Sequence, residues 1–429
     1  MLTTKYVRDN IDAIRDSLKK RKSSYPIDEL LKLDEELRGL KTKLQQLQAR
    51  RNRESLEISA AKKRGEDTGG RIAALAGIKG EIEDLEASIP TYDDRVNFLL
   101  WNMPNILDES VKYGKDETEN TELRRWGKPS EKALTGGHVD LLENLNLIEI
   151  ERAAKVAGAR FYFLKGDFVL LAKSLERFAL DFLAKKGYMP LQPPYLMKKE
   201  HYKGVTGLGD FEDMLYSVGM PKESKKEEKG EEELFMIATS EHPMAALHAG
   251  EVFSAKELPI RYAGISPCFR REAGTHGKDT KGIFRVHQFD KVEQFIFCRQ
   301  EDSWKLYDEI VANEEEIFQA LGVPYSVIEM CTGDIGIVAA KKIDLEGWFP
   351  SQQKYREVTS ASNCTDWQSL RLDIKYDDRG ERKYVHTLNG TAISIERALT
   401  VIAENYANTD GTITVPDVLV PYMGKSRIG

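Results

Sequence analysis

The chain has 429 residues, of which 31% are charged and 41% are hydrophobic, and its formal net charge is −7 at pH 7. This length accommodates two or three domains, and the composition is typical of a soluble globular protein with a highly charged part. A negative net charge does not favour a nucleic-acid binder. No run of about 18 apolar residues occurs, so we expect no transmembrane helix, and the N-terminus is too polar for a secretory signal.

The four cysteines are widely separated along the chain, at Cys268, Cys298, Cys331 and Cys364. They show neither CxxC spacing nor the histidine cluster that accompanies structural zinc. We therefore expect reduced thiols in a cytoplasmic protein that holds no zinc.

The N-terminal part carries two series of apolar residues with the alternating spacing of heptads. The first comprises Leu30, Leu33, Leu37, Leu40, Leu44 and Leu47, and the second runs from Leu75 through Ile78, Ile82, Leu85 and Ile89 to Met103. Gly65 and the pair Gly69–Gly70 break the helix between them, and Pro90 is expected to kink or interrupt the second helix. Two matching apolar faces joined by a short turn predict an antiparallel coiled-coil hairpin over about residues 28–103. Its first helix would be roughly 55 Å long at 1.5 Å per residue, so it should project.

Basic residues cluster towards the tip of this hairpin in spite of the negative net charge. They are Arg50, Arg51, Arg53, Lys62, Lys63 and Arg64, whereas the second helix carries Glu81, Glu83, Asp84 and Glu86. One interpretation is the solvated face of a coiled coil. The other is a rod whose basic half reaches the phosphate backbone of a large partner.

Residues 106–130 are rich in polar residues and glycine and are interpreted as a linker. Beyond them, helical stretches such as Leu171–Lys186 alternate with short β-rich runs such as Leu234–Ile237 and Gln294–Phe297. This alternation predicts an α+β body over residues 131–429 around a mostly antiparallel sheet. The charged run 222–233 is expected to be a solvated surface loop.

Two segments in this body predict one polar surface. Arg270 and Glu272 are two residues apart, and Phe289, Lys291 and Glu293 repeat that spacing on an expected returning strand. Side chains two apart on a strand point to the same face. An arginine can hold a phosphate through its fork of donors, a ring can stack on a base, and Glu293 can bind an ammonium group. The alternative is an amphipathic hairpin with a solvated charged face.

Two other short segments combine polar side chains. Thr239 and Glu241 follow the apolar run LFMIA and would share one face of a strand. Glu357 and Ser360 place a carboxylate near a hydroxyl, which suits Mg²⁺, a hard cation that takes few protein ligands. The alternative for the second segment is an ordinary polar turn.

The stretch from Arg270 to Glu293 closely resembles motif 2 of the class II aminoacyl-tRNA synthetases, in the form found in seryl-tRNA synthetases. The resemblance continues through TSEHP, REVTSASNCTDWQSLR and HTLNGTAISIERALTVIAENY and covers essentially the whole chain, including the N-terminal hairpin. KKGYMPLQPPYL is similar to motif 1, with Pro194 as its proline, and GTAISIER is similar to motif 3. Several phrases look more like the archaeal and eukaryotic branches, and the lack of suitable cysteines disfavours the zinc-dependent methanogen type.

This resemblance implies a serine–tRNA ligase with an N-terminal tRNA-binding domain over residues 1–105 and a class II catalytic domain over residues 131–429. Such an enzyme activates L-serine with ATP to seryl-adenylate and transfers serine to tRNA(Ser), and charging of tRNA(Sec) is a further expectation. The hairpin would contact the long variable arm of tRNA(Ser). Motif 1 implies a homodimer, because it builds the dimer interface in this family.

The resemblance also implies residue roles. Arg270 would hold the α-phosphate of a bent ATP and Arg397 its γ-phosphate. The other implied contacts are adenine with Glu272 and Phe289, Mg²⁺ with Glu357 and Ser360, and serine with Thr239, Glu241, Glu293 and Thr391. Which of Glu241 and Glu293 binds the ammonium and which the hydroxyl stays open. Glu396 departs from the glycine common in bacterial members, and we expect it to point away from Arg397.

Two alternatives to a serine–tRNA ligase remain. One is a relative that activates an amino acid and loads it on a carrier protein, but such relatives lack the tRNA-binding hairpin, whose heptads are intact here. The other is a non-catalytic coiled-coil scaffold, and the presence of Arg270, Glu272, Glu357 and Arg397 argues against it.

Overall fold

The computed structural model describes residues 3–131, 134, 136–207, 212–219, 233–272 and 281–429. The predicted surface loop 222–233 lies outside the described residues except for its last residue, and so does the middle of the motif 2 segment, residues 273–280. The chain divides into two compact units, Leu2–Met103 and Pro104–Gly429.

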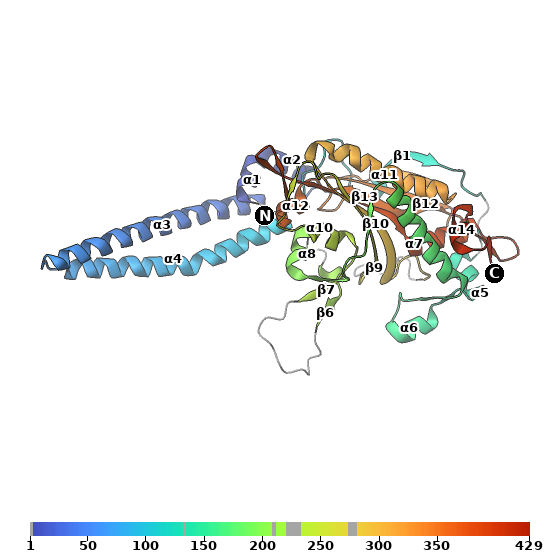
Figure 1. Ribbon diagram of the computed structural model, residues 1–429, viewed down its shortest axis with the longest axis horizontal. Coiled ribbons are helices and arrows are strands. Elements are labelled where there is room, and N and C mark those ends of the chain that lie inside the picture. Colours follow the sequence, from blue (N-terminus) through green and yellow to red (C-terminus); the bar gives the residue numbers. More distant parts are fainter. Residues whose placement is uncertain (1–2, 132–133, 135, 208–211, 220–232, 273–280) are drawn as a thin grey trace. The chain divides into compact units, whose positions relative to one another are not determined.

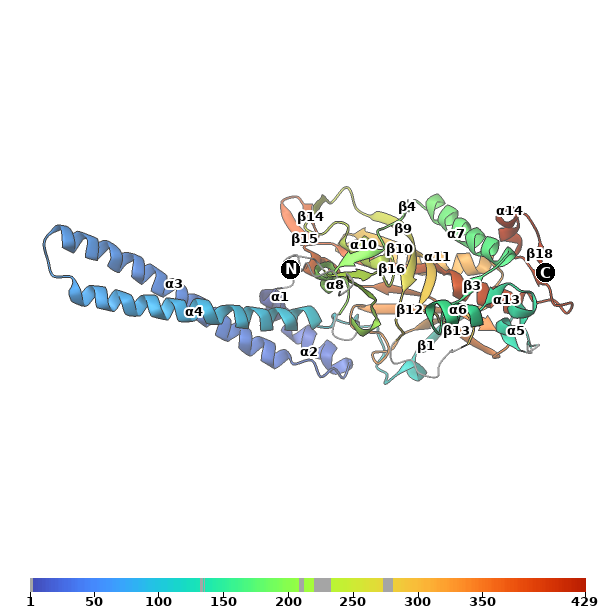
Figure 2. The ribbon, with the colours of Figure 1, turned by 90° about the horizontal axis from the view of Figure 1, so that it is seen from below.

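The first unit is a long helical hairpin, as the heptads predict. Two short helices, α1 (Thr4–Asp9) and α2 (Ile11–Lys20), precede α3 (Ile27–Lys63) and α4 (Gly69–Asn102). The helices α3 and α4 lie side by side along their length (Figure 1 and Figure 2). The helix α4 continues through Pro90 without interruption, so of the two expected effects of this proline the interruption does not occur. The expectation for the glycine pair was wrong, because Gly69 and Gly70 begin α4 instead of separating it from α3.

Apolar residues of the two heptad series bury each other along the hairpin. Leu30, Leu37 and Leu47 of α3 and Ile82 and Val96 of α4 are all at most 9% exposed. Ion pairs flank this seam, joining Lys41 to Asp93, Lys43 to Glu81, Arg71 to Glu57, and Arg95 to Glu29. Such exposed pairs contribute roughly 0–1 kcal/mol each, so burial of the apolar seam is the main stabilising interaction.

An eight-stranded sheet is the centre of the second unit, within the described residues. Its strand order is β1-β11-β12-β13-β16-β10-β9-β4, and neighbouring strands are antiparallel except for β4 and β9. The strand bounds are β1 Thr121–Trp126, β4 Met189–Leu191, β9 Ile260–Phe269, β10 Gln288–Cys298, β11 Tyr325–Glu329, β12 Lys341–Phe349, β13 Lys354–Asn363 and β16 His386–Ser394. The predicted mostly antiparallel α+β body is confirmed.

Helices cover this sheet and short strands surround it. The helices are α5 Gly137–Asn144, α6 Glu151–Ala157, α7 Asp167–Lys185, α8 Lys199–Val205, α10 Glu241–Ala246, α11 Ser303–Ala320, α12 Trp367–Leu372, α13 Ile395–Asn405 and α14 Val420–Met423. The short strands are β2 Ile148–Glu149, β3 Phe163–Leu164, β5 Leu196–Lys198, β6 Ser217–Val218, β7 Leu234–Met236, β8 Val252–Ser254, β14 Lys375–Asp378, β15 Glu381–Tyr384, β17 Ile413–Thr414 and β18 Arg427–Ile428. Single 3₁₀ turns lie at Glu117–Glu119, Glu212–Met214, Gln300–Asp302 and Asp417–Leu419.

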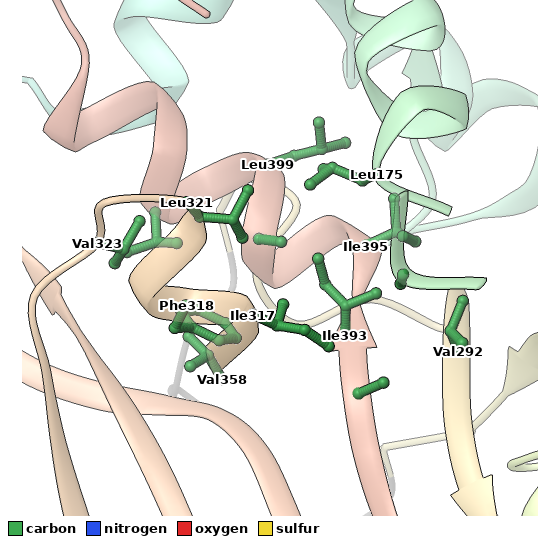
Figure 3. Close-up of a cluster of buried hydrophobic side chains, with 14 of the residues drawn as sticks. Leu175, Val292, Ile317, Phe318, Leu321, Val323, Val358, Ile393, Ile395 and Leu399 are labelled. Carbon is green, nitrogen blue, oxygen red and sulfur yellow. The ribbon is translucent and has the colours of Figure 1, made fainter. Parts of the chain in front are cut away.

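The main hydrophobic core lies between one face of the sheet and the helices α7, α11 and α13. Figure 3 shows Leu175 of α7, Phe318 of α11 and Leu399 of α13 in this layer, together with Val292 and Ile393 of the sheet. Because strand side chains alternate, residues next to Val292 on β10 point to the opposite face. That opposite face carries the polar residues described below.

The segment 106–130, interpreted as a linker, instead contributes β1 to the sheet. This edge strand pairs with β11 from Thr121 to Trp126. Asn105, directly before the segment 106–130, donates hydrogen bonds to the carbonyl oxygens of Val338 and Cys364. The polar composition that suggested a linker reflects an edge strand, whose outer side is exposed to solvent.

Candidate active site

A polar cavity of about 240 Å³ lies on the side of the sheet opposite the hydrophobic core. All of the predicted site residues except Thr239 line it, namely Glu241, Arg270, Glu272, Phe289, Glu293, Glu357, Ser360, Thr391 and Arg397. The guanidinium of Arg270 and the carboxylate of Glu293 therefore lie on the same side of the sheet. This shared side is the arrangement that the spacing on the two strands predicts.

Arg270 lies just beyond the end of β9 and is held by its backbone. Its N–H donates to the carbonyl oxygen of His287 at 2.9 Å, and its side-chain Nε donates to the carbonyl oxygen of Ala238 at 3.3 Å. The guanidinium packs over the ring of Phe289, 5.1 Å from its centre. The ring and the cation thus form one wall of the cavity.

Glu272 reaches the cavity by a route that the strand spacing did not predict. The strand β9 ends at Phe269, and Glu272 has a left-handed backbone with φ of +49°. Its carboxylate binds Arg285, with Oε2 at 2.6 Å from Nε. The prediction that Arg270 and Glu272 share a strand face was therefore wrong, although both line the same cavity.

Glu293 is the most buried of the predicted site residues, at 1% exposure. Its carboxylate contacts the ammonium group of Lys291, and its Oε2 accepts a hydrogen bond from the Thr391 hydroxyl at 3.2 Å. A buried carboxylate needs such partners, because an isolated buried charge is costly. Lys291, Glu293 and Thr391 thus form a compact charged group on the floor of the cavity.

Thr239 and Glu241 do not share a strand face, because β7 ends before them and Glu241 begins α10. The Thr239 hydroxyl accepts the backbone N–H of Glu241 at 3.2 Å. Thr239 lines an adjoining cavity of about 380 Å³, to which Glu241 and Arg270 also contribute. The two cavities share Glu241 and Arg270 in their linings, so Thr239 lies next to the cavity that the other predicted site residues line.

Amide side chains orient the carboxylate of Glu241. Its Oε1 accepts from Gln368 Nε2 at 3.0 Å and from Asn389 Nδ2 at 3.2 Å. Burial raises the pKa of Glu241 to about 7, and the negative charge of Glu293 adds to the effect, although Lys291 opposes it. Glu241 therefore titrates near neutral pH.

A β-bulge brings Glu357 and Ser360 to the same side of β13. Residues three apart on a regular strand face opposite sides. Here Glu346 of β12 pairs with Glu357, and the preceding residue, Leu345, pairs with Thr359. Val358 therefore has no partner on β12 and is the extra residue of a bulge. The same irregularity on β16 makes Ala392 the extra residue and brings Thr391 and Ser394 to the cavity.

Arg397, at the start of α13, forms an ion pair with Glu357. The distance from Arg397 Nη1 to Glu357 Oε1 is 2.8 Å. Burial raises the pKa of Glu357, but the charges of Arg397 and Lys342 outweigh it and lower the pKa to about 2. Glu357 is thus ionised at neutral pH. An ionised carboxylate beside the Ser360 hydroxyl is a donor set that fits Mg²⁺.

Several residues that line the cavity were not predicted from the sequence. The ring of Phe284 lies between two guanidinium groups, 4.0 Å from that of Arg356 and 5.1 Å from that of Arg397. Asn389 contacts Glu241, and the two-residue spacing of Asn389 and Thr391 on one strand could have identified it. No comparable periodic signal marks Phe284, which lies outside any strand.

The carboxylate of Glu396 is bonded away from the guanidinium of Arg397, as expected. It accepts hydrogen bonds from the Tyr162 hydroxyl and from the backbone N–H of Asp290. Glu396 is 3% exposed and lines the cavity.

Three observations bear on the other expectations. All four cysteines are free thiols and are buried. Among the residues that the structure describes, no helix is both long and apolar enough to cross a membrane. Within the same residues, no group of three or more histidine, cysteine, aspartate and glutamate side chains is placed to hold a metal ion.

Comparisons with known proteins identify the family. Residues 1–107 match the model of the seryl-tRNA synthetase N-terminal domain, and residues 224–406 match that of the class II tRNA synthetase core domain for G, H, P, S and T. Serine–tRNA ligases of Methanocella arvoryzae and Nitrosopumilus maritimus are 48% and 44% identical, over 99% and 100% of both chains.

Solved structures agree with this result. The crystal structure of the seryl-tRNA synthetase of Pyrococcus horikoshii complexed with ATP matches with a TM-score of 0.89 and 44% identity, over 100% of this chain and 99% of that one. The cytoplasmic serine–tRNA ligase of Naegleria fowleri in complex with AMP matches with a TM-score of 0.83 and 38% identity, over 98% and 95% of the two chains. The chain therefore belongs to the seryl-tRNA synthetase family of class II aminoacyl-tRNA ligases.

Proposed function

We propose that this protein activates L-serine with ATP to form seryl-adenylate and then transfers the seryl group to tRNA(Ser). The observation that carries the proposal is the single cavity that joins the two arginines to the buried acidic residues. Arg270 and Arg397 supply positive charge for a triphosphate, and Glu241 and Glu293 supply acceptors for a small amino acid. The relative from Pyrococcus horikoshii was solved with ATP, which supports a nucleotide in the same cavity.

In the first step, the serine carboxylate attacks the α-phosphorus of ATP in line, and diphosphate leaves. A carboxylate is already ionised at pH 7, so this step needs no general base. The protein contributes alignment and charge stabilisation. Arg270 binds the α-phosphate, Arg397 binds the γ-phosphate, and Glu272 and Phe289 bind the adenine.

Glu357 and Ser360 would hold Mg²⁺ beside the phosphates. The ionised carboxylate and the hydroxyl face the cavity together because of the bulge at Val358. When bound, Mg²⁺ neutralises negative charge on the phosphate oxygens. Glu357 and Arg397 must then exchange their mutual contact for the metal and the γ-phosphate.

Serine recognition uses Thr239, Glu241, Glu293 and Thr391. Glu293 already accepts from Thr391 and contacts Lys291, whereas Glu241 accepts two amide donors at Oε1. One carboxylate binds the ammonium and the other the hydroxyl of serine. A site built to bond a hydroxyl discriminates strongly against alanine, because a buried acceptor would lose its partner.

In the second step, a ribose hydroxyl at the end of the tRNA attacks the carbonyl carbon of the seryl-adenylate, which forms the seryl ester of the tRNA and releases AMP and a proton. We assign tRNA(Ser) binding to the N-terminal domain, residues 1–105, through the basic side of the hairpin, and catalysis to residues 131–429, with 106–130 between them. The proposal also includes charging of tRNA(Sec) and a cytoplasmic location. It further includes assembly into a homodimer through the motif 1 region at α7 and β4. The matches to the seryl-tRNA synthetase N-terminal domain and to the class II core domain support the assignment of tRNA binding and of catalysis to these two parts of the chain.

One experiment tests the function against its alternatives. It measures serine-dependent exchange of pyrophosphate into ATP, followed by transfer of labelled serine to purified tRNA(Ser). We expect both activities. Exchange without transfer would favour a relative that loads a carrier protein, and absence of exchange would favour a non-catalytic scaffold.

A further inference from the structure

Glu396 is a buried acidic residue to which the proposed function gives no role. It lies in the first turn of α13, directly before Arg397, and is 3% exposed. Its Oε2 accepts the backbone N–H of Asp290 at 2.9 Å, and its Oε1 accepts the hydroxyl of Tyr162. Both oxygens are thus engaged with groups outside its own helix.

The contact with Asp290 takes the place of a missing strand pair. Pairing between β10 and β16 begins with Lys291 opposite Ser394, and β16 ends there. Residues 288–290 of β10 extend beyond this pair, so the N–H of Asp290 has no strand partner on that side. The Glu396 carboxylate supplies the acceptor, as buried backbone donors require.

This bond joins the two sides of the nucleotide site. The N–H of Asp290 belongs to the peptide group that follows Phe289, whose ring forms one wall of the cavity. Arg397, which follows Glu396 in sequence, forms another wall. A single side chain therefore links the backbone of the aromatic wall to the backbone of the cationic wall.

We propose that Glu396 is a positioning residue that fixes the separation of Phe289 and Arg397 and thereby sets the affinity for ATP. The proposal rests on the proposed function of this cavity. Tyr162 assists by holding the carboxyl group in the orientation that reaches Asp290. Serine binds around Glu241 and Glu293, which make no contact with this link, so serine affinity should not depend on it.

Burial, with a smaller contribution from the charge of Asp290, favours a neutral carboxyl group at Glu396. Burial raises the pKa of Glu396 to about 8, and the nearby carboxylate of Asp290 adds to the effect, whereas the bond from Tyr162 opposes it. Asp290 itself faces Lys173, which also pairs with Glu176. Glutamine is therefore a close substitute, since its carbonyl can accept from Asp290 and its amide can donate to Tyr162.

The experiment compares Glu396→Ala, Glu396→Gln and Tyr162→Phe in the full chain, with KM for ATP and for serine measured by pyrophosphate exchange. We expect Glu396→Ala to raise KM for ATP about tenfold or more, because small misplacements of binding groups are costly, while KM for serine stays within about twofold. Glu396→Gln should restore most of the ATP affinity, and Tyr162→Phe should lie between them. Ile402→Val, a buried change on the same helix, is the control for lost packing and should leave both constants unchanged.

The affinity for ATP is also measured by calorimetry for the unaltered protein and for Glu396→Ala. This measurement distinguishes a failure of the proposed function from a failure of the positioning role. If the unaltered protein shows no serine-dependent exchange, the proposed function is refuted, and weaker ATP binding by Glu396→Ala would still support the positioning role. Equal ATP affinity in the folded Glu396→Ala protein would overturn that role. A parallel rise of both KM values with a lowered melting temperature would overturn it as well.

Discussion

Arg397 and Glu357 contact each other across the cavity, with Nη1 of the first 2.8 Å from Oε1 of the second. Arg397 lies in the first turn of α13 and Glu357 lies on β13, so the ion pair joins the residue proposed to bind the γ-phosphate to the proposed metal ligand. In the proposed function, Arg397 would exchange this partner for phosphate and Glu357 would exchange it for Mg²⁺. The side chain of Glu357 is 44% exposed, so water can replace part of the contact as it opens.

Replacing Glu357 with glutamine should raise the Mg²⁺ concentration for half-maximal pyrophosphate exchange by about tenfold or more, because an ionised ligand becomes neutral. The measurement is exchange titrated with Mg²⁺. Glu346→Gln is the matched control, since Glu346 pairs with Glu357 across β12 and β13 but does not line the cavity of about 240 Å³. An unchanged Mg²⁺ requirement in the Glu357 variant would remove this residue from the metal site.

Arg270→Ala should lower serine-dependent exchange by about 100-fold or more, because it removes the donors expected at the α-phosphate. The adjacent Arg271 is exposed and does not line the cavity, so Arg271→Ala should retain exchange. Equal rates for the two variants would contradict the assignment of the α-phosphate to Arg270.

Serine binding should weaken as the pH falls through about 7. Because the pKa of Glu241 is raised to about 7, its carboxylate is present above that pH and is lost by protonation below it. KM for serine should therefore rise from pH 8 to pH 6, while KM for ATP changes less. The check is the same titration with Glu241→Gln, which should bind serine weakly at every pH. A persistent slope in that variant would assign the titration to another group.

Shortening the hairpin to a brief turn should leave serine-dependent exchange intact and strongly reduce charging of tRNA(Ser). A finer test replaces Lys62, Lys63 and Arg64 with alanine, which should raise KM for tRNA about tenfold at physiological salt by removing phosphate contacts. Glu83→Ala on the second helix is the control. Normal charging by the shortened protein would mean that the hairpin is not the tRNA-binding element.

Gly390→Ala should destabilise the second unit by about 1–3 kcal/mol through overpacking. A Cβ at this position would lie 2.2 Å from Ile310 Cγ2 and 2.7 Å from Glu314 Oε1, both on α11 beneath the sheet. Denaturant unfolding measures the effect. Gly77→Ala on α4, where a Cβ would meet nothing within 4 Å, should instead be neutral or slightly stabilising.

The sequence predicted those parts of the fold that depend on periodic burial. The heptads defined the hairpin, and the alternation of Phe289, Lys291 and Glu293 placed three side chains on one face of β10. Periodicity failed where the backbone departs from regular geometry. Glu272 has a positive φ, and Glu241 begins a helix, so neither obeys the strand spacing that first suggested it.

Other features were invisible because they depend on tertiary contacts. The edge strand β1 has an exposed, polar composition that resembles a linker, and only pairing with β11 defines it. Phe284 shows no periodic pattern, and its position between Arg356 and Arg397 depends on segments far apart in sequence. The resemblance to a known family named nine residues of this cavity, whereas the hydrogen bonds from Asn389 to Glu241 and from Asp290 to Glu396 are visible only in the folded structure.

The bulges at Val358 and Ala392 let side chains an odd number of positions apart face the same cavity. Three positions separate Glu357 from Ser360, and three separate Thr391 from Ser394, a spacing that would place the two members of each pair on opposite faces of a regular strand. Deleting Val358 or Ala392 would leave each pair two positions apart, which is a same-face spacing on a regular strand. A one-codon deletion at either bulge should therefore keep both side chains on the cavity side, whereas an insertion of one residue elsewhere between the two members of a pair would turn one of them away.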